Sequence, residues 1–586
     1  MSKISLFVIR ILILSFALNL IPANTEVKAA WREPVRAKRA MVASQHELAS
    51  KIGADVMKRG GNAIDAAVAV ALALAVVYPE AGNLGGGGFM LIRFGDGLKG
   101  DRPPQELFDA TLIDYREMAP ADANRDIFVD RDGKLIKGEG SSTVGYRAAG
   151  VPGTPAGLDM AFKKYGSKKL TWAQLVEPAR KLAQDGYVLS YRLANLFKKF
   201  DENLSIYEDS KKIFLNNGKF YEEGDVLKQP DLAQTLARMQ RFGAKEFYTG
   251  KTAQLIAADM KAHNGLMTLE DLKNYEAKER VPLRGNYRGY EIISAPPPSS
   301  GGIVMLQCLN MLEKYDLRKM GWASSEKYHV LTEAMRRAFA DRAEVLGDPD
   351  FVKVPTATLI DKKYAAKRAD SINLKKASKS SDVKAGKLDG KESMETTHFT
   401  VVDTEGTVVT NTYTINDLYG SGVTAKGTGI LLNDEMDDFA ARPGTPNLYG
   451  LIQGENNAVQ PKKRPLSSMT PTIVLRKDGS FWFALGGRGG PRIINAVLQA
   501  VINVIDHDMN IQQAIDAPRI HHQWFPDELL SEPLGMSTDT REALEKLGHK
   551  FGEPLYIASM TAIMVDEKGV RLGAIDSRSD GEAIGF

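Results

Sequence analysis

The sequence predicts a large globular protein that contains both helices and strands, and two observations support this fold class. Of its 586 residues, 43% are hydrophobic and 25% are charged, which is ordinary for a globular chain with a sizeable core. Helical patterns with many charged residues recur over 155–200 and 230–280. Runs rich in β-branched and aromatic residues predict strands over 89–94, 399–402, 407–409, 472–475 and 481–485.

Composition and charge exclude several other classes. The 76 basic and 73 acidic residues leave a net charge of +3, so we expect no nucleic-acid partner. The single cysteine, Cys308, excludes an intrachain disulfide framework and a cysteine-based zinc or iron–sulfur site. The eight histidines are scattered without metal-ligand spacing, so we expect structural histidines and no bound metal. Collagen-like, coiled-coil, disordered and polytopic membrane proteins are also excluded.

The N-terminus has the layout of a signal peptide. Lys3 and Arg10 precede an apolar stretch over 11–20, and the small-residue motif VKA at 27–29 offers a cleavage site. The alternative, a single membrane anchor, needs about 20 apolar residues, more than this stretch contains. We therefore predict that residues 1–29 are removed during export, leaving no stable membrane anchor and a periplasmic or extracellular protein.

The first strongly apolar segment after the signal peptide is 66–77 (AAVAVALALAVV). It is too short to span a membrane, and its small side chains suit a buried helix packed closely against a sheet. The glycine run over 82–88 then precedes a strand. In a dinucleotide-binding fold the glycines precede a helix instead, so we interpret this run as a tight turn.

Residues 371–395 differ from the rest of the chain. They are rich in Lys, Ser, Asp and Gly and contain almost no large apolar side chains. Such a segment cannot bury enough surface to offset the entropy lost on ordering. The sequence therefore predicts a flexible linker that ends abruptly at Thr396, where a strand begins with two threonines. On this feature alone, an ordinary inter-domain linker is the simplest interpretation.

Three polar loops could carry chemistry. Residues 433–439 (NDEMDDF) crowd acidic side chains together, and 464–471 (RPLSSMTP) contain paired hydroxyls. Residues 486–492 (GGRGGPR) lie between a predicted strand and a predicted helix over 493–505, where backbone N–H groups could stabilise an oxyanion. Taken separately, each loop also fits an ordinary turn or a solvated acidic surface. No G-x-S-x-G elbow precedes a helix, which disfavours an ordinary serine hydrolase.

These loops belong to a set of motifs that resembles the γ-glutamyltranspeptidase (glutathione hydrolase) family of N-terminal-nucleophile hydrolases. The most specific combination is TTHF, EMDDF and PLSSM at 396–399, 435–439 and 465–469. Further matches run nearly end to end: GNAIDAAVAV, NLGGGGFMLI, DYREMAP, GVPGTPAGL, APPPSSGGI, NTYTIN, GGRGGPRII and APRIHHQW. The resemblance implies an α+β fold, a four-layer αββα sandwich that a large and a small subunit build jointly. It implies no metal or organic cofactor.

The resemblance also implies a precursor that cleaves itself between Glu395 and Thr396. Residues 30–395 would form the large subunit, with 371–395 as the linker before the cut, and 396–586 would form the small catalytic subunit of a heterodimer. The Thr396 hydroxyl would attack the preceding carbonyl carbon and give an ester that water opens. The released α-amino group titrates near pH ~7.7–8.0 and can then serve as general base for the same hydroxyl.

The remaining site residues are assigned by the same resemblance. Thr414 would hydrogen-bond the nucleophile, and Gly489 and Gly490 would form the oxyanion hole, although GGRGGPR stands where many relatives have GSPGGSR. A γ-glutamyl group presents an α-carboxylate and an α-ammonium, which suit a guanidinium with hydroxyls and a group of acids, respectively. The implied residues are Arg116, Ser467 and Ser468 for the carboxylate, Asn416, Glu435 and Asp438 for the ammonium, and Tyr449 in a lid loop over 443–456.

The implied reaction is a two-step acyl transfer. Thr396 takes the γ-glutamyl group from glutathione or another γ-glutamyl compound and passes it to water or to an amino-acid or dipeptide acceptor. One alternative is a relative specialised for a bulkier acyl group, such as a glutaryl cephalosporin acylase. Another is an exported amino-acid-binding protein, which would remain a single band on a denaturing gel. Glu435 has its own alternative, in which its side chain only points to solvent.

Overall fold

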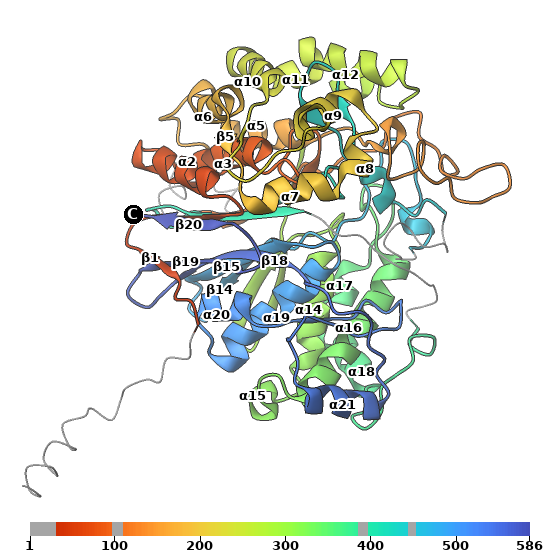
Figure 1. Cartoon of the computed structure of the whole chain (residues 1–586). Coiled ribbons are helices and arrows are strands. Elements are labelled where there is room, and N and C mark those ends of the chain that lie inside the picture. Colours follow the sequence, from red (N-terminus) through yellow and green to blue (C-terminus); the bar gives the residue numbers. More distant parts are fainter. Residues whose placement is uncertain (1–30, 96–108, 385–395, 443–452) are drawn as a thin grey trace, which may run out of the picture. The chain divides into compact units, whose positions relative to one another are not determined.

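The computed structural model describes residues 31–95, 109–384, 396–442 and 453–586. Within residues 34–586, two seven-stranded antiparallel sheets are stacked face to face, and helices cover the outer face of each sheet (Figure 1). This confirms the α+β fold with four αββα layers. The predicted signal peptide lies outside the described residues, and none of the described helices is long and apolar enough to cross a membrane.

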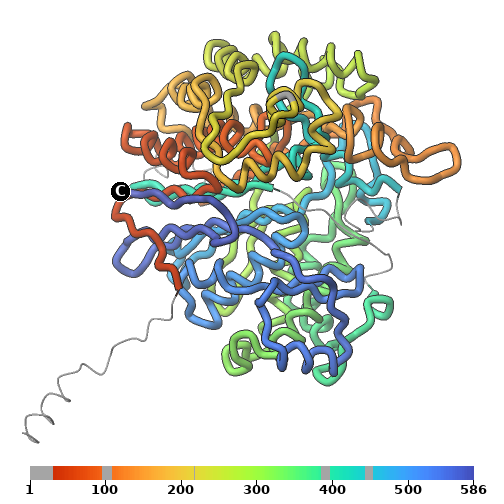
Figure 2. The backbone as a smooth tube through the Cα atoms, viewed as in Figure 1, coloured from red at the N-terminus to blue at the C-terminus, as the bar shows by residue number. Residues whose placement is uncertain are grey.

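One sheet, called here the β10 sheet, places the strand that follows Thr396 near its centre. Its order is β20-β2-β10-β11-β3-β4-β7. The strands are β20 (Glu582–Gly585), β2 (Met41–Ser44), β10 (Thr397–Val402), β11 (Val408–Thr414), β3 (Gly87–Arg93), β4 (Ala110–Asp114) and β7 (Lys278–Arg280). Strands from before and after Thr396 are therefore hydrogen-bonded neighbours within one sheet, as the mixed colours of neighbouring strands in Figure 2 show.

The other sheet, called the β15 sheet, has the order β1-β19-β18-β15-β14-β9-β8. Its strands are β1 (Val35–Ala37), β19 (Arg571–Ile575), β18 (Ser559–Val565), β15 (Phe481–Arg488), β14 (Thr472–Leu475), β9 (Tyr290–Ser294) and β8 (Leu283–Tyr287). Short two-stranded pairs are β5 (Tyr187–Val188) with β6 (Val226–Leu227), β12 (Thr424–Ala425) with β13 (Ile430–Leu431), and β16 (Ile520–His521) with β17 (Leu530–Ser531).

Helices form the two outer layers. On the β10 side they are α2 (Glu47–Lys58), α3 (Ala63–Val77), α5 (Thr154–Tyr165), α6 (Trp172–Asp185), α7 (Tyr191–Lys199), α8 (Asp201–Leu204), α9 (Glu208–Phe214), α10 (Pro230–Phe242), α11 (Lys245–Thr249), α12 (Lys251–Ala262) and α13 (Leu269–Lys273). On the β15 side they are α14 (Gly301–Leu312), α15 (Leu317–Met320), α16 (Ser325–Val345), α17 (Thr356–Leu359), α18 (Lys362–Asp370), α19 (Arg492–His507), α20 (Ile511–Asp516) and α21 (Thr538–Leu547). Short 3₁₀ turns are η2 (Tyr146–Ala148), η3 (Asn216–Gly218), η4 (Glu435–Asp438) and η5 (Glu455–Asn457).

The predicted buried helix over 66–77 is confirmed as α3. All of its side chains are buried, because it packs between the β10 sheet and its neighbours α2 and α6. Asn62 caps its first turn: the Asn62 side chain accepts from the N–H of Asp65, and the Asp65 carboxylate accepts from the N–H of Asn62. The five predicted strands and the predicted helix over 493–505 are confirmed as β3, β10, β11, β14, β15 and α19.

A buried histidine fills the space between the two sheets. His398 on β10 contacts Thr412 (Nδ1 to Oγ1, 2.7 Å) and Thr410 (Nε2 to Oγ1, 3.0 Å). Burial lowers its pKa to about 3, so the ring is neutral at physiological pH. Gly486 on β15 lies directly opposite, where a Cβ atom would stand 2.3 Å from the ring. The first glycine of the GGRGG run is therefore required by the close approach of the sheets.

Residues 371–384 of the predicted flexible linker make specific contacts with the rest of the chain. Ser380 in this segment is fully buried, and its N–H donates to Asp527 (2.8 Å), while Trp524 Nε1 donates to the Ser380 carbonyl (2.8 Å). These hydrogen bonds to the backbone add to the burial of Ile372 and Val383, and a prediction based on composition does not count them. Residues 385–395, including Glu395, lie outside the described residues.

Candidate active site

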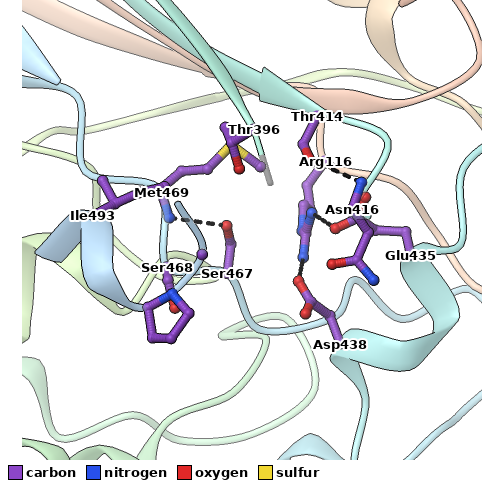
Figure 3. Close-up of a pocket in the computed structure, with 12 residues that line it drawn as sticks. Arg116, Thr396, Thr414, Asn416, Glu435, Asp438, Ser467, Ser468, Met469 and Ile493 are labelled. Carbon is purple, nitrogen blue, oxygen red and sulfur yellow. Dashed lines mark hydrogen bonds and ion pairs between the residues drawn. The ribbon is translucent and has the colours of Figure 1, made fainter. Parts of the chain in front are cut away.

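The antiparallel pairing of β10 and β11 places two predicted site residues together. Thr397 pairs with Tyr413, so the start of β10 and the end of β11 meet at the same end of the sheet. Thr396 and Thr414 therefore lie next to each other, and both line one pocket, shown in Figure 3. Thr396 is 4% exposed, so it is almost completely buried at the wall of this pocket.

The same pocket gathers almost all of the residues predicted from the sequence. Its lining comprises Arg116, Thr396, Thr414, Asn416, Glu435, Asp438, Ser467, Ser468 and Gly490 from that set, together with Met469, Pro491 and Ile493. Gly489 lines a neighbouring pocket instead. Tyr449 lies outside the described residues, as does most of the predicted lid loop. Residues separated by more than 300 positions in the chain thus converge on one site.

Arg116 forms the centre of a buried charge cluster. It follows β4, is fully buried, and forms ion pairs with Glu435 through Nη1 and with Asp438 through Nη2. Its Nε donates to the carbonyl oxygen of Pro465 (3.3 Å), which fixes the guanidinium beside the serine loop. Figure 3 shows Arg116 between these acids and Ser467. The described arrangement therefore balances the arginine charge with acids of the same pocket.

Sequence reasoning missed a third acid of this cluster, Glu117. Its Oε2 accepts from Arg116 Nη1 (3.3 Å), and its side chain is fully buried. Burial raises the pKa of Glu117 to about 7, although the Arg116 charge opposes that shift. The signal that could have identified it is its position in the DYREMAP motif, directly after the predicted carboxylate-binding arginine.

Glu435 does not point to solvent, so that alternative is wrong: its side chain is 1% exposed. Burial raises the pKa of Glu435 well above its ordinary value. Arg116 opposes this, whereas Glu117 and Asp438 raise the pKa further. Three acids therefore surround one guanidinium, and burial together with mutual repulsion raises the pKa values of Glu117 and Glu435.

Asn416 is placed by an unusual backbone. Its φ of 74° lies in the left-handed region, which Asn tolerates better than most residues. Its N–H donates to Thr414 Oγ1 (2.8 Å), and its side-chain Nδ2 donates to the carbonyl oxygen of Asp434 (3.1 Å). Thr414 therefore accepts a hydrogen bond on one side and presents its own hydroxyl proton on another.

The serine pair lies in a loop just before β14. The N–H of Ser467 donates to the Pro298 carbonyl (2.8 Å), and the Ser467 hydroxyl accepts from the N–H of Met469 (3.2 Å). Ser468 is 9% exposed and lines the pocket. The two bonds of Ser467 fix its hydroxyl, which lies beside Arg116 in Figure 3.

The glycine turn between β15 and α19 closes the pocket. Gly489 and Gly490 have φ values of 135° and 57°, which L side chains rarely adopt. A Cβ atom at Gly489 would stand 2.9 Å from the carbonyl oxygen of Ile557. The positive φ values and the nearby carbonyl oxygen require glycine at this turn. The backbone of Gly490 forms part of the pocket wall.

Among the described residues, no group of three His, Cys, Asp or Glu side chains could hold a metal ion.

Two stacked antiparallel sheets between helical layers, with a threonine at the head of a central strand and facing a polar pocket, are the architecture of N-terminal-nucleophile hydrolases. The family model described as Gamma-glutamyltranspeptidase matches residues 49–586. The chain belongs to the gamma-glutamyltranspeptidase family.

Curated relatives cover nearly the whole chain. A glutathione hydrolase proenzyme of Escherichia coli (strain K12) is 49% identical over 559 residues, which span 95% of this chain and 93% of that protein. An acylase ACY 1 proenzyme of Pseudomonas sp. (strain SE83) is 37% identical over 558 residues, spanning 94% of each chain.

Two solved structures extend the comparison. A cephalosporin acylase from Bacillus halodurans has a TM-score of 0.81 at 25% identity, with coverage of 97% of this chain and 99% of that one. A γ-glutamyltranspeptidase from Helicobacter pylori has a TM-score of 0.55 at 44% identity, with coverage of 61% of this chain and 97% of that one. The identity is thus higher in the structure that bears the family name, although the solved chain is shorter.

Proposed function

We propose that this protein is an exported, self-cleaving γ-glutamyltransferase and glutathione hydrolase with Thr396 as its nucleophile. The observation that carries the proposal is the convergence of Thr396, an arginine, paired serines and acids on one pocket. A γ-glutamyl group has one free carboxylate and one free ammonium, and this pocket offers groups of the matching type to both. Its γ-carbonyl would then face the Thr396 hydroxyl.

Binding of such a zwitterion would account for the ion-paired cluster around Arg116. In the described arrangement, Arg116 is paired with Glu435 and Asp438. The substrate carboxylate would form an ion pair with Arg116 in place of part of its present pairing. The acids released from Arg116 would then pair with the substrate ammonium. Because a zwitterion adds no net charge, its binding leaves the net charge of the buried pocket unchanged, which avoids the large cost of an unpaired buried charge.

The chemistry then proceeds in two acyl-transfer steps. The Thr396 hydroxyl attacks the γ-carbonyl carbon, its α-amino group accepts the proton, and the leaving amine departs after protonation. Backbone N–H groups at Gly489 and Gly490 would stabilise the oxyanion, and Thr414 would orient the nucleophile. Water or an amino-acid or dipeptide acceptor then attacks the γ-glutamyl ester and regenerates Thr396.

The proposed protein is exported and cleaved into two subunits. Removal of residues 1–29 would accompany export to the periplasm or the medium, and cleavage between Glu395 and Thr396 would give large (30–395) and small (396–586) subunits. The interleaved strands of both sheets would hold these subunits together as a heterodimer. Tyr449 and its lid loop would shield the bound substrate.

Two measurements on the purified protein test this function. A denaturing gel should show a small fragment of about 21 kDa, the share of 64.2 kDa that 191 of 586 residues represent, beside a larger fragment. γ-Glutamyl-p-nitroanilide should release p-nitroaniline, faster with a dipeptide acceptor. A preference for glutaryl-p-nitroanilide, which lacks the ammonium, would favour the acylase alternative instead. A single full-length band without turnover would contradict the proposal.

The Glu435→Gln variant should reveal the raised pKa of Glu435. While Glu435 holds its proton, a glutamine is a close mimic, so kcat/KM of the variant should stay within about threefold of the unchanged enzyme near pH 6. As pH rises and Glu435 ionises, the unchanged enzyme gains a charge for the substrate ammonium and should increasingly outperform the variant. Profiles of kcat/KM from about pH 5 to about pH 9 check this. Parallel profiles throughout would contradict a role of Glu435 in ammonium binding.

A further inference from the structure

We propose that Arg342 is a positioning residue for the serine pair Ser467–Ser468, through which it aligns the α-carboxylate of the donor substrate. The inference rests on the proposed function and extends it to a helix that the motif comparison did not use. Arg342 lies on α16 and is 1% exposed. It is not among the described residues that line the pocket, so it would act through the serines.

The guanidinium of Arg342 contacts two hydroxyls at once. Its Nε donates to Ser300 Oγ (2.8 Å), and its Nη2 donates to Ser468 Oγ (3.2 Å). The rigid planar fork of an arginine fixes the spacing between the two groups that it contacts. Ser300 and Ser468 are therefore held in a defined relation by a single side chain.

Ser300 connects Arg342 to Ser467, the other member of the serine pair. Its hydroxyl and its N–H both donate to the carbonyl oxygen of Ser467, each at 2.7 Å. Arg342 therefore braces Ser468 directly and Ser467 through Ser300. This also assigns a task to the PPSSGG segment of the sequence, which otherwise appears only as a family motif.

The direction of the hydrogen bonds determines what Ser468 can do. An arginine can only donate, so Ser468 Oγ accepts from Arg342 and its one hydroxyl proton must point elsewhere. A carboxylate can only accept, and Ser468 lines the pocket in which the substrate carboxylate would lie. Arg342 thus directs the Ser468 proton away from itself, and a substrate carboxylate in the pocket would accept that proton in a hydrogen bond.

Charge supports the same assignment. Arg116, the arginine inside the pocket, is paired with Glu435 and Asp438 in the described arrangement. A second guanidinium directly behind Ser468 would add positive potential on the side where a carboxylate must bind, and a low-dielectric interior strengthens that attraction.

The test compares two donors that differ only at the α-carboxylate. One is γ-glutamyl-p-nitroanilide, and the other is the same anilide with its α-carboxylate converted to a carboxamide. Arg342→Gln should lower the ratio of kcat/KM values, carboxylate donor over carboxamide donor, by about tenfold, mainly through a higher KM for the carboxylate donor. Arg342→Lys keeps the charge but loses the fork, so its ratio should be intermediate.

A matched control lies on the same helix. Arg337 is similarly buried but donates to Glu333 and Ser371 instead of the serine pair. Arg337→Gln should therefore leave the donor ratio as in the unchanged enzyme. Ser300→Ala removes one arm of the brace with little change in volume, and its ratio should fall by about threefold. If Arg342→Gln gives no cleaved enzyme, the donor ratio of Ser300→Ala tests the positioning role instead.

The outcomes separate this inference from the proposed function. An unchanged donor ratio in Arg342→Gln would overturn the positioning role, even if both kcat/KM values fall. If that variant gives no cleaved enzyme, an unchanged donor ratio in Ser300→Ala would overturn it. An absence of p-nitroaniline release by the unchanged enzyme would instead contradict the proposed function itself.

Discussion

Thr396→Ala is expected to give a single uncleaved chain that releases no p-nitroaniline. One hydroxyl would serve as nucleophile in both self-cleavage and turnover, and without cleavage no α-amino group is freed to act as base. Loss of a nucleophile from a cooperating set costs about 10⁴-fold or more in rate. A denaturing gel and an anilide assay on the same preparation measure both effects.

Thr397→Ala is the matched control for this experiment. Thr397 is the next residue, lies within β10 and is fully buried, whereas Thr396 lines the pocket. The Thr397→Ala protein should therefore still give two subunits and turn over substrate. Two subunits from Thr396→Ala, together with an uncleaved chain from Thr397→Ala, would move the nucleophile to Thr397.

Arg116→Ala is expected to show the second-largest loss, with kcat/KM for the γ-glutamyl anilide lower by about 10²-fold or more. Removing the guanidinium takes away the partner of the substrate carboxylate and leaves Glu117, Glu435 and Asp438 together without their cation. Removing one partner from a buried ion pair typically costs about 3–5 kcal/mol. The acids would respond by taking up protons, which weakens ammonium binding as well.

Self-cleavage provides the internal control for Arg116. The bond before Thr396 has no free α-carboxylate, so Arg116→Ala should still yield two subunits while KM rises. Arg116→Lys keeps a positive charge without the fork and should lose less activity than Arg116→Ala. An unchanged KM in Arg116→Ala would contradict the carboxylate-binding role.

The sequence predicted many local elements because each has a local cause. The capping side chain of Asn62 and the run of small apolar residues specify α3 without reference to any distant contact. The β-branched strands and the helix after the glycine turn are specified in the same way. The pocket residues were predicted from the family resemblance instead, because no spacing in the chain shows that Arg116 and Glu435 meet.

Three features could not be predicted from the sequence. Arg342 carries no local signal of function, because its role depends on the serines that the fold places beside it. The one signal for Glu117 is its place beside Arg116 in the DYREMAP motif, and its burial with Glu435 and Asp438 is decided by the fold. Residues 371–384 have the composition of a flexible segment, yet hydrogen bonds from Trp524 and to Asp527 hold them in place. The partners of Arg342 and of Ser380 lie more than 40 positions away in the chain, beyond any local pattern.

The sequence by itself determined the elements, the family resemblance and the candidate residues, because periodicity, capping and short motifs depend on neighbours in the chain. The tertiary structure alone decided that these residues share one pocket, that three acids pair with Arg116, and that Glu435 is buried rather than solvated. The physical reason is that burial and electrostatics depend on three-dimensional proximity. Desolvation raises the pKa of Glu435 and Glu117 only once the two sheets and their loops enclose them.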